Sequence, residues 1–183
     1  MNGGVHKLKF DAELVRQAKM GNEESFTQLY DMAAPFLYKL AVYTLGNPQD
    51  AEDVVSETFI EAYKGIGKLR DEAAFKPWIT KILSIRCKRK IGDYVKNKNV
   101  YDIDDFLGLT EDDSDLSAEA GDRAVVAHAM GLLSYEEREI VLLSVLQGYT
   151  VKEISKIIRM PQGTVSSKLY RALKKMRTYI EES

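Results

Sequence analysis

Residues 150–177 read TVKEISKIIRMPQGTVSSKLYRALKKMR, and this stretch decides the fold of the C-terminal part of the chain. Residues 150–153 have the form of a capping box, which predicts the start of a short helix with one apolar face. Residues 159–161 break that pattern, and a second helix follows them. Its inner side is predicted to carry Val165, Leu169, Leu173 and Met176. The stretch therefore predicts two helices joined by a short turn.

The outer side of the second helix is polar, basic and aromatic. Residues 160–177 hold five basic residues and no acidic one. A helix pair with a basic second member is typical of a helix-turn-helix, whose second helix enters the major groove of DNA. A solvated basic helix in an αα-hairpin is the alternative that the pattern leaves open. The outward residues are Gly163, Ser166, Ser167, Lys168, Tyr170, Arg171, Lys174 and Lys175.

The rest of the chain also reads as helices. Residues 140–146 are apolar nearly all round, which predicts a buried helix that supports the helix-turn-helix. Residues 134–137 form a second capping box. Gly46 ends a long helix that begins near Glu23, and Asn47-Pro48 starts the next one. Because no alternating strand pattern bounded by turns occurs, we expect an all-α protein.

The acidic residues are unevenly distributed. The net charge is −2, yet residues 101–122 contain nine acidic residues and no basic one, so the remainder carries +7. Self-repulsion and poor burial predict that this stretch is a flexible linker. We therefore expect two small helical domains, residues 1–98 and 123–183, joined by an acidic linker at 99–122.

The composition excludes several classes of function. The chain has one cysteine and two histidines, so neither an intrachain disulfide nor a Cys/His zinc site is expected. No apolar run approaches the roughly 18 residues of a membrane-spanning helix, and the first residues lack the apolar core of a signal peptide. We expect a cytoplasmic protein with no catalytic residues, no metal, no cofactor, no small-molecule substrate and no membrane insertion.

The helix that starts at Asn47-Pro48 has an acidic stripe opposite its apolar face. The stripe consists of Asp50, Asp53, Glu57 and Glu61, and the apolar face of Val55, Phe59, Ala62, Tyr63 and Ile66. Four carboxylates on one face repel one another, so the stripe predicts a basic partner. A merely solvated face is the alternative.

A second candidate for nucleic-acid binding follows this helix. Residues 65–70 form a basic, glycine-containing loop, and residues 76–98 carry eight basic residues against one acidic residue. Aromatic side chains beside a mobile basic loop suit single-stranded DNA, because bases stack on rings while cations follow the backbone. Phe75 and Trp78 supply the rings. The alternative is that Trp78 belongs to the core with its apolar neighbours.

The motifs occur in a characteristic order. They are GNEESFTQLY at 21–30, DAEDVVSETF at 50–59, FKPWI at 75–79, YTVKEI at 149–154 and GTVSSK at 163–168. In this order and spacing the chain resembles the extracytoplasmic-function sigma factors of the sigma-70 family, which are two-domain subunits that direct RNA polymerase to promoters. The resemblance covers nearly the whole chain outside the linker.

The resemblance implies three interfaces. The first domain docks on the clamp helices of the largest subunit of core RNA polymerase through Asp50, Asp53, Val54, Ser56 and Glu57. It captures the melted non-template strand of the −10 element through Lys68, Arg70, Phe75, Trp78, Lys81 and Arg86. The second domain reads the −35 duplex through Gly163, Thr164, Ser166, Ser167, Lys168, Tyr170, Arg171, Lys174 and Lys175. The resemblance also implies an anti-sigma factor as a partner, and a linker that enters the polymerase.

Four residues depart from the family pattern. Ser56 replaces a common glutamine, Ile85 a frequent asparagine and Ser166 a frequent Lys or Arg. Arg159 replaces a common turn glycine, which predicts either a left-handed non-glycine residue or a different closure of the turn.

Three other functions compete with promoter recognition. A stand-alone helix-turn-helix regulator would bind duplex DNA without polymerase, but it would leave the acidic helix unexplained. An enzyme built on Asp53 and Glu57 would lack a partner group for its carboxylates. A protein adaptor would leave the basic helix without a role.

Overall fold

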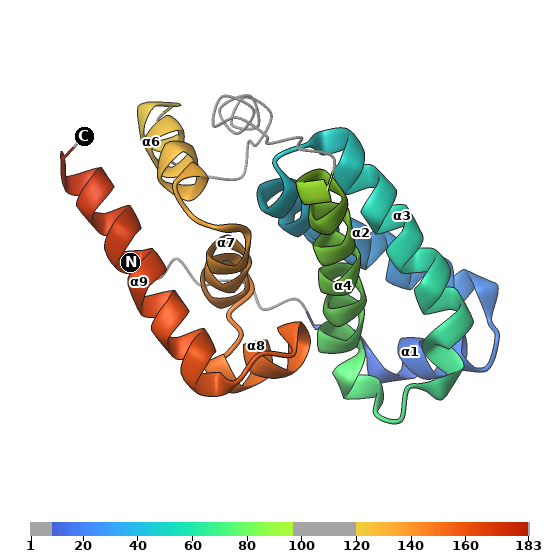
Figure 1. Cartoon of the computed structure of the whole chain (residues 1–183). Helices are drawn as coiled ribbons and strands as arrows, with labels where there is room; N and C mark the ends of the chain where they lie inside the picture. Colours follow the sequence, from blue (N-terminus) through green and yellow to red (C-terminus); the bar gives the residue numbers. More distant parts are fainter. Residues whose placement is uncertain (1–8, 97–119, 183) are drawn as a thin grey trace.

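The computed structural model describes residues 9–96 and 120–182, and these ranges contain helices and no β-strand (Figure 1). The all-α prediction is confirmed. The first domain consists of α1 (Ala12–Lys19), α2 (Glu23–Leu45), α3 (Pro48–Gly65) and α4 (Phe75–Lys96). Between α3 and α4 lie the 3-10 turns η1 (Ile66–Lys68) and η2 (Glu72–Ala74).

The helix boundaries of the first domain follow its capping residues. The Asn22 side chain accepts a hydrogen bond from the Ser25 amide at 2.8 Å and starts α2. Gly46 ends α2 with a left-handed φ of 75°, a conformation that costs glycine little. Asn47 then caps α3, with Pro48 in the first turn as predicted. The core between α2, α3 and α4 includes Leu29, Leu37, Leu45, Phe75, Ile79 and Leu83.

The second domain contains the predicted helix-turn-helix. Its elements are α6 (Ala120–Gly131), α7 (Tyr135–Val141), the π-helical turn η4 (Leu142–Leu146), α8 (Val151–Ile158) and α9 (Gln162–Glu182). Both predicted capping boxes are present, one at the start of α7 and one at the start of α8. Arg159 lies between α8 and α9 with a left-handed φ of 56°, so the turn keeps the glycine-like conformation without glycine.

The segment predicted as one buried apolar helix, residues 140–146, ends in a π-helical turn, which is wider than a regular α-helical turn. In η4 the Gln147 amide donates to the Leu142 carbonyl at 3.2 Å, five residues back. Leu142 and Leu143 are buried, but Val145 is 53% exposed. The prediction that this segment is buried all round was therefore wrong at its C-terminal end.

Most of the predicted linker lies outside the described residues. Residues 99–119 are not described, while residues 120–122 belong to α6. The helix begins three residues earlier than the boundary predicted from charge. The boundaries of the two domains otherwise stay a prediction.

The two domains lie against each other in Figure 1, where α7 and α8 stand between α4 and α9. α8 packs on α4, and α7 packs on α2. A single apolar cluster includes Leu83 of α4, Ile140 of α7 and Ile154 of α8. This arrangement leaves α9 on the side of the second domain that faces away from α4.

Candidate nucleic-acid interface and docking surface

The outer face of α9 collects the residues predicted to read duplex DNA. Val165 and Ala172 are buried on its inner side, while Leu169 and Met176 are half-buried. Thr164 and Lys168 are also half-buried. The remaining predicted residues are exposed: Gly163, Ser166, Ser167, Tyr170, Arg171, Lys174 and Lys175. Because these side chains share one helix face, the structure brings the predicted set together.

Leu173 was predicted to face inward, but it is 43% exposed. It sits at the edge of the apolar stripe, where the smaller Ala172 takes the buried place instead. The prediction placed the centre of the stripe too far toward Leu173.

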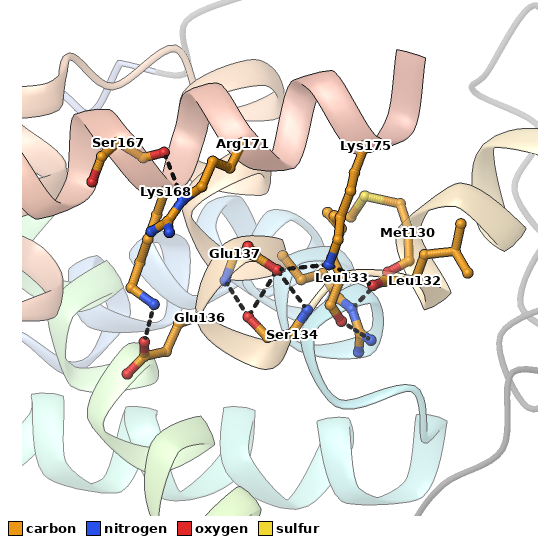
Figure 2. Close-up of polar contacts among 11 residues, drawn as sticks. Met130, Leu132, Leu133, Ser134, Glu136, Glu137, Ser167, Lys168, Arg171 and Lys175 are labelled. Atoms are coloured by element: carbon orange, nitrogen blue, oxygen red, sulfur yellow. Dashed lines mark hydrogen bonds and ion pairs between the residues drawn. The ribbon is translucent and has the colours of Figure 1, made fainter. Parts of the chain in front are cut away.

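Two lysines attach α9 to α7, as Figure 2 shows. Lys168 pairs with Glu136 at 2.8 Å, and Lys175 lies 3.7 Å from Glu137. Partial burial would raise the pKa of Glu137, but hydrogen bonds from Ser134, with the nearby lysines, hold that pKa below its usual value. Lys168 and Lys175 therefore also stabilise the domain, in addition to any contact with DNA.

The other two cations of this face are not neutralised within the described residues. The Arg171 Nε atom donates to the Ser167 carbonyl at 3.3 Å, which orients the guanidinium along its own helix (Figure 2). Neither Arg171 nor Lys174 forms an ion pair with a described carboxylate. Together with Tyr170, which is 69% exposed, they give α9 a face suited to phosphates and base edges.

The acidic stripe of α3 finds its basic partner within the same domain. The Arg86 guanidinium of α4 pairs with Glu61 and, at 3.1 Å, with Glu57. Lys90 lies 2.6 Å from Asp50 and 3.8 Å from Asp53. The hydrogen bond with Glu61 raises the pKa of Arg86, against the effect of partial burial.

The predicted polymerase-docking residues of α3 separate into two groups. Ser56, Asp53 and Glu57 are exposed, the two acidic side chains by 64% and 56%. Asp50 is largely covered, because the Tyr94 hydroxyl donates to it and Lys90 pairs with it. Val54 is only 3% exposed and packs in the core, so in this structure it cannot contact a partner.

The residues predicted to bind single-stranded DNA also differ in exposure. Lys68 and Arg70 are exposed on the segment between α3 and α4. Phe75 is buried, with its ring edge-on to Phe10 at a centroid distance of 4.9 Å. The prediction of Phe75 as a base-stacking residue therefore does not fit this structure, because the start of α4 turns the ring into the core.

Trp78, Lys81 and Arg86 are half-buried. The indole of Trp78 lies against Gly65, where an added Cβ would be 3.4 Å from the ring. Trp78 thus belongs partly to the core, as the alternative interpretation allowed, and remains partly accessible next to Gly65. Arg86 is turned toward α3 by its ion pairs and does not join that segment.

Sequence reasoning missed an apolar hollow on the surface of α2 and α3. Its volume is about 390 Å³. It is lined by Tyr30, Ser56, Phe59, Ile60, Tyr63 and Lys64. Tyr63 was predicted on the apolar face of this helix, but it is 55% exposed, and Ile60 is 57% exposed. The sequence feature that could have revealed this hollow is the pair of large apolar residues at 60 and 63, which lie three residues apart on one helix.

The described residues contain neither a candidate metal site nor a candidate membrane span. No group of three or more His, Cys, Asp or Glu side chains there is placed to hold a metal ion. No helix in residues 9–96 or 120–182 combines the length and apolar character needed to span a membrane.

Comparison with known families agrees with this geometry. The family model for Sigma-70 region 2 matches residues 29–97, and the one for Sigma-70, region 4 matches residues 123–176. A region 2 followed by a region 4 defines a sigma-70-type transcription initiation factor. Within that class, the chain belongs to the extracytoplasmic-function sigma factors, as the motifs predicted.

Curated relatives are similar over most of their length. The ECF RNA polymerase sigma factor SigM of Mycobacterium tuberculosis is 27% identical, over 93% of this chain and 84% of its own. SigW of Bacillus subtilis, with the same description, is 25% identical over 92% of this chain and 95% of its own.

Solved structures share the fold. A chain in the structure of CnrH in complex with the cytosolic domain of CnrY has a TM-score of 0.68, with 21% identity, and covers 94% of this chain and 98% of its own. A chain in the complex of the sigma factor RpoE with the anti-sigma factor NepR from Bartonella quintana has a TM-score of 0.66, with 22% identity, over 86% of this chain and 98% of its own.

Proposed function

We propose that this sigma factor recruits core RNA polymerase to promoters by reading a −35 duplex with α9 and capturing the melted non-template strand of a −10 element with its first domain. The observation that carries the proposal is the outer face of α9, where small residues precede an exposed aromatic ring and two cations that pair with no described carboxylate. This face has the composition of a major-groove reader.

The −10 interface is proposed at the segment between α3 and α4. Lys68 and Arg70 are exposed there, and at the start of α4 Trp78, whose ring lies against Gly65, and Lys81 are partly accessible. Cations that track a backbone next to a ring on which a base can stack are the usual means of holding a single strand. Phe75 and Arg86 would support this interface through packing and through the ion pairs with α3.

The docking surface is proposed as the exposed edge of α3 together with the apolar hollow. Asp53 and Glu57 provide negative charge, and Ile60 and Tyr63 provide apolar area next to them. A basic, amphipathic helix on the polymerase clamp would match both features. The names of the relatives, which call them RNA polymerase sigma factors, support this choice of partner.

An anti-sigma factor is proposed as a second partner. Support comes from the fold neighbour RpoE, which was solved in complex with the anti-sigma factor NepR. The acidic segment at 99–119 lies outside the described residues, and its entry into the polymerase is proposed on the resemblance alone.

The proposal is tested by transcription in vitro with core polymerase on a library of genomic fragments, with and without the protein. We expect new start sites that share two upstream elements. Asp53→Lys should reduce the yield and the co-purification of polymerase, whereas Glu182→Lys, an equal charge change at the exposed end of α9, should leave polymerase binding unchanged. Unaltered start sites in the presence of the native chain would exclude a sigma-factor role.

A further inference from the structure

The segment that joins α3 to α4, residues 66–74, is held in its middle by apolar side chains. Ile66 is 4% exposed and Leu69 is 8% exposed, whereas Lys68 and Arg70 are exposed. The backbone of Leu69 is extended, with φ −66° and ψ 117°, so that neighbouring side chains point to opposite sides. Burial of Leu69 therefore directs the two basic side chains outward.

The last turn of α1 lies directly against this segment. α1 packs on both 3-10 turns, η1 and η2, and Figure 1 shows the chain passing α1 on its way from α3 to α4. The backbones also come close, since a Cβ added at Gly67 would be 3.9 Å from the Lys19 carbonyl oxygen. α1 is thus the part of the domain against which the segment is placed.

One ion pair connects α1 to the segment. The Lys19 ammonium donates a hydrogen bond to the Glu72 carboxylate, and the two side chains are only 17% and 29% exposed. This hydrogen bond holds the pKa of Glu72 below its usual value, so the carboxylate is charged at neutral pH. Within residues 9–96 and 120–182 it is the one ion pair that the segment forms.

The end of the segment that carries Glu72 has a defined shape of its own. The Asp71 side chain caps η2 and accepts a hydrogen bond from the Ala73 amide at 3.0 Å. Because Glu72 follows Arg70 by only two residues, a bond that fixes Glu72 also limits where the arginine can point. Lys19 is the last residue of α1, where a positive charge is favoured by the helix dipole.

We propose that the Lys19–Glu72 ion pair is a positioning pair for single-strand capture, which keeps the exposed cations of the segment in one orientation toward the melted −10 strand. The inference rests on the proposed function, because it concerns the same interface. It adds two residues that act through their neighbours and do not touch DNA themselves. Cations that are fixed in advance lose less conformational freedom on binding, which raises affinity.

A purely electrostatic role for Glu72 leads to the opposite expectation. A carboxylate beside Arg70 repels the phosphates that the arginine attracts. Its removal should then strengthen DNA binding. If the carboxylate instead holds the segment on α1, its removal should weaken DNA binding. The two roles therefore differ in the sign of the effect as well as in its size.

The test uses RNA polymerase assembled with the full chain and a fluorescent fork-junction DNA, which is duplex at a −35 element and carries only the non-template strand at −10. The fragment is taken from a start site mapped by transcription in vitro. Glu72→Gln should weaken binding by about two- to fivefold, the range that one partly exposed ion pair allows. Lys19→Ala should cause a similar loss, and Lys19→Arg should restore most of the affinity.

A charge reversal separates positioning from net charge. The double variant Lys19→Glu with Glu72→Lys should bind the fork more tightly than Glu72→Lys alone, although the double variant is less positive. Glu13→Gln is the matched control, because it removes the same charge from α1, where Glu13 pairs with Arg16. This control should leave affinity unchanged. A duplex that holds only the −35 element should bind equally in every variant.

The outcomes are distinct. Unchanged or tighter binding of the fork by Glu72→Gln, or a double variant weaker than Glu72→Lys alone, would overturn the positioning pair. An equal loss on the −35 duplex would indicate general destabilisation and would overturn it as well. If the native chain gives polymerase no more affinity for the fork than core enzyme has, the proposed function fails instead.

Discussion

The two basic helices of this protein, α4 and α9, have similar sequences in terms of charge but different surfaces. On α4, Arg86 and Lys90 are neutralised by the carboxylates of α3. On α9, Lys168 and Lys175 pair with Glu136 and Glu137 of α7, whereas Arg171 and Lys174 have no ion pair with a described carboxylate. A count of basic residues therefore indicates a nucleic-acid surface only when the residues that form ion pairs with a neighbouring helix are left out of the count.

The largest effect is expected at Phe75, which the resemblance placed in the single-strand site and the structure places in the core. Phe75→Ala should lower the free energy of unfolding by about 3–5 kcal/mol, because it removes a buried ring. Urea unfolding followed by circular dichroism measures this loss. An unchanged free energy of unfolding would mean that the Phe75 ring is not part of the core. The prediction that Phe75 binds DNA would then stand, and the contrast between α4 and α9 would be weaker.

The next effect is expected on α9. Arg171→Ala and Lys174→Ala should each weaken binding to the −35 duplex by about 1–3 kcal/mol if they contact bases, and by less if they contact phosphates. Fluorescence anisotropy over a salt series distinguishes the two cases. Arg177→Ala is the control, since Arg177 lies on the same helix but pairs with Glu181 at 2.7 Å. Equal losses in all three variants would indicate a general charge effect and not a reading face.

A smaller effect is expected for Arg86. Arg86→Ala should lower the stability of the first domain by about 1 kcal/mol or less, because its partners Glu57 and Glu61 are half-exposed. It should leave the salt dependence of single-strand binding unchanged, whereas Arg70→Ala should reduce that slope by about 0.7. Binding of a melted −10 strand in complex with polymerase, measured over a range of salt, is the assay. The opposite ranking would mean that Arg86 leaves α3 to bind DNA.

The smallest effect is expected at Arg159, which carries a basic charge in the second domain but lies off the reading face. Arg159→Gly should raise the free energy of unfolding by about 0.5 kcal/mol, since relief of a left-handed backbone, about 1–2 kcal/mol, exceeds the added entropy of the unfolded chain. Thermal unfolding measures the gain. Loss of −35 affinity in this variant would extend the reading face beyond α9.

The sequence predicted those features that depend on neighbouring residues. The caps at Asn47, Ser134 and Thr150 were correct, because a capping side chain bonds to backbone only two or three residues away. Most of the outer face of α9 was correct for the same reason, since a helical wheel needs only the helix itself, but Lys168 is half-buried and Leu173 is exposed.

The features that depend on distant residues were not predictable in this way. Val54 and Tyr63 both lie near the border of the apolar face of α3, and the positions of the neighbouring helices decide that one is buried and the other exposed. The pairing of Arg86 with Glu57 and Glu61 depends on how α4 lies across α3. The contact between Ser84 and Glu139 joins residues of two domains, and no local pattern encodes it.

The π-helical turn η4 works as a one-residue spacer between α7 and the helix-turn-helix. Each residue of a regular helix advances the chain by about 100° around the axis, so one inserted residue changes the direction in which everything after it leaves the helix. Removing Ser144 would let α7 continue as a regular helix and rotate the departing chain by about that angle. The orientation of α9 relative to the first domain thus depends on a single inserted residue that lies outside α9 itself.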